Sequence, residues 1–180
     1  MYCGCNKMAL SSLNNISESF VELLKEKEYS KISISEICER ADVSRQTFYS
    51  LFKSKENIIS FELLKNYYFD AQKECSGTRP TVDEISRSFS EYIISKEEFI
   101  RLLEKNNIMY FMQDSLYESL ICCCKNETED TDCELIADLM AANLTTIAKH
   151  YVQHTADISK LSLNSYIKNI LTKFECHKST

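Results

Sequence analysis

Residues 33–55 read SISEICERADVSRQTFYSLFKSK, and this stretch decides the fold. Ser33, followed three residues later by Glu36, fits a capping box, in which the two side chains bond free backbone N–H groups at a helix start. The helical spacing of apolar residues is broken at Asp42, and Ser44 can cap a new helix directly afterwards. The pattern therefore predicts two short helices joined by a tight turn.

The second of these helices is expected to bury one face and expose the other. Its apolar side chains, Phe48 and Phe52, are expected in the core. The opposite face carries Arg45, Gln46, Thr47, Tyr49 and Ser50. Arginine can bond guanine in a bidentate way, glutamine can do so with adenine, a threonine methyl can touch thymine, and tyrosine suits phosphate contacts. The pattern therefore favours a DNA-reading helix-turn-helix from about Ser33 to Phe52.

The same stretch resembles a known family. The run is Ser33-x-x-Glu36-Ile37-Cys38-x-x-Ala41-Asp42-Val43-Ser44-x-x-Thr47-Phe48-Tyr49-x-x-Phe52-x-x-Lys55-Glu56-x-Ile58. It closely resembles the TetR/AcrR family of transcription regulators, and the resemblance covers residues 9–65. It implies a DNA-binding head of three helices at the N-terminus, followed by a variable helical domain that binds small ligands and dimerises.

The resemblance also implies which side chains contact DNA. They are Ser33, Ser35, Arg45, Gln46, Thr47, Tyr49, Ser50 and Lys55. Other interpretations stay open: Arg45 and Gln46 could simply be solvated, Tyr49 could pack against the following helix, and the first two serines could serve only as caps. The family usually has glycine where Asp42 stands. This turn position favours a positive φ, which aspartate tolerates at a small local cost.

The composition favours an all-α fold. Of 180 residues, only two are glycine and one is proline, fewer turn residues than sheets and hairpins need. The net charge of −6 argues at first against a nucleic-acid partner. However, residues 1–55 carry eight basic and seven acidic residues, whereas residues 56–180 carry 13 basic and 20 acidic ones. The acidity therefore lies outside the expected DNA-binding head.

Apolar residues at helical spacing predict about nine helices. They are 9–27, two short helices capped by Ser33 and Ser44, a fourth capped by Ser54 and running to Glu74, then Thr81–Ser95, Lys96–Lys105, Ile108–Cys124, Cys133–Tyr151 and Leu163–Phe174. We expect a DNA-binding domain at 1–65 and a C-terminal ligand-binding and dimerisation domain at 66–180. The last two helices have broad apolar stripes and are expected to pair with a second copy in a homodimer.

Candidate ligand-binding residues lie in the C-terminal domain. They are Phe89, Tyr92, Met109, Met112 and Leu116. Aromatic and methionine side chains line ligand pockets, but they also fill ordinary cores, and both interpretations stay open. Residues of these types do not indicate the chemistry of the ligand.

Two further clusters raise the question of metal or redox chemistry. Cys122, Cys123 and Cys124 are consecutive, so on a helix they point about 100° apart and cannot all ligate one metal. His150 and His154 share a helix face and can bind a metal, but the sequence does not show a third ligand. We therefore expect mostly reduced thiols, no metal site and no cofactor.

The sequence shows no phosphate loop, nucleophile elbow or HExxH motif, so we do not expect an enzyme. It also shows no signal peptide and no membrane-length apolar stretch, so we expect a cytoplasmic protein without membrane contact. The predicted function is a ligand-responsive repressor, a homodimer on a palindromic operator in double-stranded DNA, with an unknown small-molecule effector. The alternatives are a protein-binding adaptor of the same fold and a thiol-redox sensor.

Overall fold

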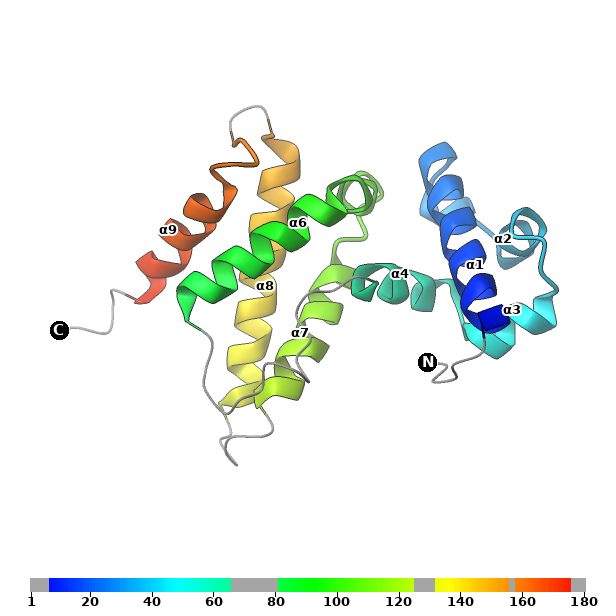
Figure 1. Cartoon of the computed structure of the whole chain (residues 1–180), viewed down its shortest axis with the longest axis horizontal. Coiled ribbons are helices and arrows are strands. Elements are labelled where there is room, and N and C mark those ends of the chain that lie inside the picture. The colour runs from blue at the N-terminus through cyan, green and yellow to red at the C-terminus, as the bar shows by residue number, and fades with distance from the viewer. Residues whose placement is uncertain (1–6, 66–80, 125–131, 156–157, 176–180) are drawn as a thin grey trace.

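The computed structural model is built of helices (Figure 1). It describes residues 7–65, 81–124, 132–155 and 158–175, and within these ranges it contains eight α-helices, one short 3-10 helix and no strand. This confirms the all-α fold that the composition and the helical spacing predicted.

Four helices form an N-terminal head. They are α1 (Lys7–Glu26), α2 (Ile34–Arg40), α3 (Arg45–Leu51) and α4 (Lys55–Leu64), with the 3-10 helix η1 (Tyr29–Lys31) between α1 and α2. In Figure 1, α1, α2 and α3 lie together at one end of the molecule, and α4 lies between them and the remaining helices. The side chains that fill the centre of the head are fully or almost fully buried: Ile16, Phe20, Leu24, Ile37, Phe48 and Ile58.

Four longer helices form the body. They are α6 (Val82–Lys105), α7 (Tyr110–Cys124), α8 (Cys133–Gln153) and α9 (Leu163–Glu175). The most extensive packing in the molecule is between α7 and α8, and then between α6 and α9. The bounds of α7, α8 and α9 lie close to those predicted from the apolar spacing.

The fourth helix is shorter than the sequence predicted. It ends at Leu64, because Lys65 has φ −64° and ψ 121°, which is extended backbone. The prediction of a continuous helix to Glu74 is therefore wrong, and residues 66–74 themselves lie outside the described residues. Ser54 precedes the helix as predicted, but its side chain makes no capping hydrogen bond.

Side chains of α6 explain why α4 ends where it does. The Tyr92 hydroxyl donates to the carbonyl of Leu63 at 3.2 Å, and the Lys96 ammonium donates to the carbonyl of Glu62 at 2.5 Å. These bonds satisfy carbonyls that a continuing helix would have used. The Glu62 carboxylate also accepts a bond from the Ser17 hydroxyl at 2.6 Å and lies 3.7 Å from the Lys96 ammonium. The C-terminal end of α4 is thus held by side chains of α1 and α6.

The body begins with one helix where the sequence predicted two. The predicted helices Thr81–Ser95 and Lys96–Lys105 are both parts of α6. The polar residues at the predicted boundary have partners that a helix can accommodate: the Ser95 hydroxyl donates to the carbonyl of Tyr92, and Lys96 is buried against Glu62. The apparent break in apolar spacing is therefore a polar contact with the head, not a break in the helix.

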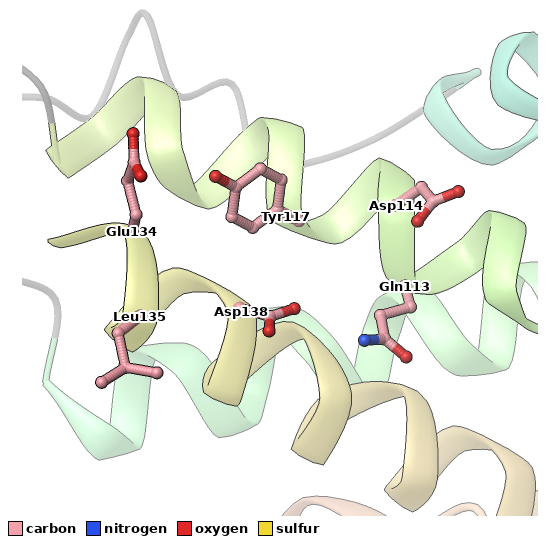
Figure 2. A pocket seen from close by; sticks show the side chains of 6 residues that line it. All are labelled: Gln113, Asp114, Tyr117, Glu134, Leu135 and Asp138. Atoms are coloured by element: carbon pink, nitrogen blue, oxygen red, sulfur yellow. The ribbon is translucent and has the colours of Figure 1, made fainter. Parts of the chain in front are cut away.

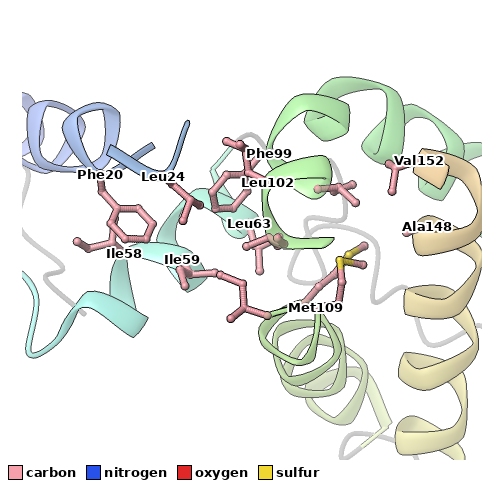
Figure 3. Close-up of a cluster of buried hydrophobic side chains, with 14 of the residues drawn as sticks. Phe20, Leu24, Ile58, Ile59, Leu63, Phe99, Leu102, Met109, Ala148 and Val152 are labelled. Carbon is pink, nitrogen blue, oxygen red and sulfur yellow. The ribbon is translucent and has the colours of Figure 1, made fainter. Parts of the chain in front are cut away.

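One hydrophobic cluster extends from the head into the body (Figure 3). On α4 it includes Ile58, Ile59 and Leu63, and on α6 it includes Phe99 and Leu102. Because α4 contributes side chains to both parts, a displacement of α6 relative to α4 would disturb the packing of the head.

Candidate nucleic-acid interface

A capping box fixes the start of α2. The Ser33 hydroxyl accepts the N–H of Glu36 at 3.3 Å, and the Glu36 carboxylate accepts the N–H of Ser33 at 2.9 Å. This confirms the predicted capping box. The Ser33 hydroxyl also donates to the same carboxylate, so it serves here as a helix cap. Ser35 is exposed in the first turn of the helix.

The turn between α2 and α3 has the predicted conformation. Asp42 has φ 51°, a positive value that aspartate tolerates better than most residues. Its N–H donates to the carbonyl of Glu39 at 3.3 Å, and the N–H of Val43 donates to the carbonyl of Cys38 at 3.0 Å. The turn thereby satisfies carbonyls at the end of α2 and sends the chain directly into α3.

The third helix buries its aromatic face. The hydroxyl of Ser44 accepts the N–H of Thr47 at 3.0 Å, which confirms Ser44 as the cap of α3. Phe48 is fully buried and Phe52 is 3% exposed. The polar side chains of the opposite face are exposed, except that Thr47 is half-buried: Arg45, Gln46, Thr47, Tyr49 and Ser50.

The polar face of α3 is partly organised by bonds within the helix. The Thr47 hydroxyl lies 2.9 Å from the Ser44 hydroxyl, and the Ser50 hydroxyl donates to the carbonyl of Thr47 at 2.7 Å. Tyr49 is 48% exposed, and its ring meets Phe48 of the same helix edge-on, with 5.4 Å between centroids. The first two residues of the helix, an arginine and a glutamine, therefore lie exposed beside an exposed tyrosine.

Lys55 lies in a different setting from the other predicted DNA contacts. Its side chain is half-buried, and its ammonium donates to the carbonyls of Tyr29 at 3.0 Å and Ile32 at 3.2 Å. It also lies 4.1 Å from the centre of the Tyr29 ring. A contact between Lys55 and DNA stays a prediction, but in this structure the ammonium is bonded to the protein's own backbone.

The five candidate ligand-binding residues belong to the core of the body. Phe89, Tyr92, Met109, Met112 and Leu116 are all 9% exposed or less. The rings of Phe89 and Tyr92 stack with 6.0 Å between centroids. The burial agrees with either of the two interpretations left open by the sequence, and ligand binding by these side chains stays a prediction.

An open groove on the body was not predicted (Figure 2). It has a volume of about 360 Å³ between α7 and α8, and its lining includes three carboxylates. The lining residues are Gln113, Asp114, Tyr117, Glu134, Leu135 and Asp138. The four-residue spacing of Glu134 and Asp138 does place both on one face of a helix. Which helix packs beside that face was not visible in the sequence.

The histidine and cysteine clusters noted in the sequence form no candidate metal site within the described ranges. No group of three or more His, Cys, Asp or Glu side chains there could hold a metal. The rings of His150 and His154 stack at 4.2 Å. Burial raises the pKa of the Cys38 thiol, as expected for a thiol in the core of the head. The side chains of Cys122–Cys124 lie outside the described residues.

None of the helices within the described ranges combines the length and the hydropathy of a membrane span. The exposed N-terminal residues of α3 follow a tight turn, and the aromatic face of this helix is buried. This is the arrangement of a helix-turn-helix DNA-binding regulator, in which the second helix enters the major groove.

Comparison with known proteins shows what the head resembles in sequence. Residues 18–60 match the family model described as bacterial regulatory proteins, tetR family. The dhaKLM operon transcriptional activator DhaS of Lactococcus lactis is 33% identical over 55 residues, which are 31% of this chain and 29% of that protein. The match with this curated relative thus spans less than a third of its length.

Solved structures resemble the chain over nearly its whole length. A protein from Listeria innocua superposes with a TM-score of 0.76 at 17% identity, covering 97% of this chain and 96% of the other. Thermus thermophilus FadR, a TetR family transcriptional repressor in complex with lauroyl-CoA, has a TM-score of 0.51 at 16% identity, covering 89% and 93%. The chain is therefore similar to the TetR family of bacterial regulatory proteins in the sequence of its head, residues 18–60, and to solved structures in the fold of the whole chain.

The capping box predicts that the head loses stability in acid. A hydrogen bond from Lys27 and two from Ser33 lower the pKa of Glu36 from 4.5 to about 2. A carboxyl group whose pKa is lower in the folded state stabilises that state above its unfolded pKa, and this contribution is lost as the pH falls through the folded pKa. We therefore expect Glu36→Gln to lower the thermal midpoint at neutral pH, and the difference from the unmodified chain to shrink between about pH 4.5 and about pH 2.

Thermal unfolding followed by circular dichroism measures this difference. The matched control is Glu39→Gln, which removes a carboxylate from an exposed position of the same helix outside the capping box. A constant difference between the Glu36→Gln variant and the unmodified chain across this pH range would contradict the assignment.

Proposed function

We propose that the protein is a ligand-responsive repressor that binds a palindromic operator as a homodimer. Residues 1–65 serve as the DNA-binding domain, and residues 66–180 bind the effector and the second copy. The observation that supports DNA binding most strongly is the exposure of Arg45 and Gln46 on the face of α3 opposite the fully buried Phe48. Each head of the dimer places α3 in a major groove of the operator, in the cytoplasm.

The exposed side chains divide into two groups by chemistry. Arg45, Gln46 and the methyl group of Thr47 suit contacts with base edges in the major groove. The hydroxyl groups of Ser35, Tyr49 and Ser50 suit phosphate oxygens, which fix the register of the head on DNA. Ser33 contributes to the same surface by holding the first turn of α2 in place.

An effector is proposed to enter the core of the body, among the five candidate residues Phe89, Tyr92, Met109, Met112 and Leu116. The Thr145 hydroxyl on α8 is buried without a hydrogen-bond partner in the described part of the chain, and a polar effector group could satisfy it. Phe89 and Tyr92 are on α6, and Tyr92 also bonds the end of α4. A ligand that displaces α6 would therefore move α4 and change the spacing between heads, and half-sites at a fixed spacing would then bind more weakly.

Dimerisation is proposed to use residues 133–151 and 163–174. Large apolar side chains are exposed on the first half of α8: Leu135 at 58%, Ile136 at 43% and Leu139 at 54%. Apolar side chains this exposed and close together on one helix favour burial against another surface. Two copies of the α8–α9 pair can form a four-helix interface with twofold symmetry.

A protein-binding adaptor remains the second candidate function, because the open groove between α7 and α8 has an acidic lining and Leu135 at its edge. The two candidates differ in their dependence on salt. A DNA-binding regulator loses affinity for DNA steeply as salt rises, because phosphate contacts release counterions. An adaptor of this fold would show no salt-sensitive binding to DNA upstream of its own gene.

Arg45 should determine sequence preference. We expect Arg45→Ala to cost about 1–3 kcal/mol of operator affinity and to relax preference at one position of each half-site, because a bidentate contact with guanine is lost. Binding titrations on operator and scrambled DNA measure both effects. Arg87→Ala, on an exposed position of α6, is the matched control and should bind both DNAs as the unmodified chain does. Equal losses on both DNAs for Arg45→Ala would show a phosphate contact instead.

The proposed interface predicts the oligomeric state. We expect sedimentation at micromolar concentration to show a species of twice the chain mass of 20.9 kDa. Leu139→Asp should shift this species toward the monomer, because the charge must be desolvated to form the interface. Leu10→Asp replaces an equally exposed leucine on α1 and should leave the dimer intact. A monomer for the unmodified chain would contradict the proposal.

A further inference from the structure

The corner between α1 and α2 is fixed by a side chain from α4. This corner consists of η1 and Ile32, which directly precedes Ser33, the cap of α2. The Lys55 ammonium donates to the carbonyl of Tyr29 at 3.0 Å and to that of Ile32 at 3.2 Å. Two of the three N–H donors of the ammonium therefore bond the backbone at the first residue of η1 and at the residue directly after it.

Tyr29 is held by the same end of α4 in a second way. Its hydroxyl donates to the Glu56 carboxylate at 2.6 Å, and the Lys55 ammonium lies 4.1 Å from the centre of its ring, a cation–π distance. Lys55 and Glu56 are the first two residues of α4. At the start of α4, Lys55 thus bonds the carbonyl of Tyr29 and lies over its ring, and Glu56 accepts a hydrogen bond from its hydroxyl.

The rest of Tyr29 connects the corner to α1 and to the body. Its ring meets Phe20 of α1 and Phe111 of α7 edge-on, with 6.3 Å and 6.0 Å between centroids. Its N–H donates to the side-chain oxygen of Asn106, at the end of α6, at 2.8 Å. Tyr29 is therefore held by α1, α4, α6 and α7. The bond from Lys55 to the Ile32 carbonyl, in contrast, is made to the residue directly before the cap of α2.

The bond to Ile32 matters because this residue connects the corner to the helix-turn-helix. Ile32 is 3% exposed, and the next residue in the chain caps α2. The direction in which α2 leaves the corner depends on the orientation of this peptide, and a tight turn joins α2 to α3. A change at the Ile32 carbonyl would therefore rotate the helix-turn-helix relative to α1 and α4.

We propose that Lys55 is a positioning residue: it sets the orientation of α2 and α3 by clamping Tyr29 and Ile32, instead of contacting a DNA phosphate as the family resemblance implies. The proposal rests on the proposed function, since orientation matters only if the head binds DNA. It assigns to Lys55 a role that acts through the backbone of the corner.

A double-mutant cycle on DNA affinity tests the proposal, with Lys55→Ala, Tyr29→Leu and the double variant in the full chain. If Lys55 acts through the corner, each single variant lowers operator affinity about tenfold. The double variant also lowers it about tenfold, because both substitutions disrupt the same contact between Lys55 and the corner. If Lys55 contacts phosphate directly, the two losses multiply to about a hundredfold, and this result would overturn the proposal. Lys53→Ala is the matched control, because Lys53 is exposed in the same segment, and its effect should multiply with that of Tyr29→Leu.

A second variant covers the case in which Lys55→Ala does not fold. Lys55→Gln keeps N–H donors for the carbonyls but removes the charge. We expect it to retain affinity within about threefold and to change the salt slope no more than Lys53→Gln does, whereas loss of a phosphate contact would lower the slope by about 0.9 for each contact. A larger slope change for Lys55→Gln than for Lys53→Gln would overturn the proposal.

Failure of the proposed function would be recognised separately. If the unmodified chain does not bind DNA in a salt-sensitive way, the proposed function fails, and the cycle is then measured on thermal midpoints. If Lys55 positions the corner, the decreases in thermal midpoint caused by Lys55→Ala and by Tyr29→Leu do not add in the double variant. If the two residues act independently, the decreases add.

Discussion

The burial of Phe48 and Phe52 against the other helices of the head fixes the rotation of α3 about its axis. With Phe48 fully buried and Phe52 only 3% exposed, the opposite face of the helix must point outward. Arg45 and Gln46 then lie at the exposed start of α3, where a DNA-reading side chain must be. The capping serines and the left-handed turn at Asp42 determine where α3 begins, but the aromatic burial determines which residues it presents.

The junction of head and body depends on a buried polar contact. Glu62 and Lys96 are 9% and 8% exposed, and the lysine bonds both the carbonyl and, at longer range, the carboxylate of Glu62. Removing the Glu62 carboxylate would leave the buried Lys96 ammonium without the carboxylate that it pairs with, so the contact resists separation of α4 from α6. In the proposed function, this contact is the route by which a displacement of α6 would reach α4.

Features that depend on neighbours in the sequence were predictable. Three such features are the capping box at Ser33, the cap at Ser44 and the positive φ of Asp42. Each depends on residues within a few positions of one another, so the local sequence predicts it. The end of α4 and the continuity of α6 were not predictable, because both depend on Lys96 meeting Glu62, 34 residues earlier in the chain. The partners of Lys55 are also distant in sequence, so the sequence did not predict them, and the family resemblance implied a DNA contact for this residue instead. The groove between α7 and α8 was not predictable either, because its lining comes from two helices.

The central claim is that the start of α3 binds DNA. Nuclear magnetic resonance of the ¹⁵N-labelled chain, titrated with DNA from upstream of its own gene, tests it most directly, because the side chains of Arg45 and Gln46 carry their own N–H signals. The side-chain amide of Gln113 in the body groove is an internal reference. The claim predicts large shifts for Arg45 and Gln46 that disappear at high salt, with Gln113 unchanged. Shifts at Gln113 with none at Arg45 and Gln46 would contradict it and would favour binding through the body.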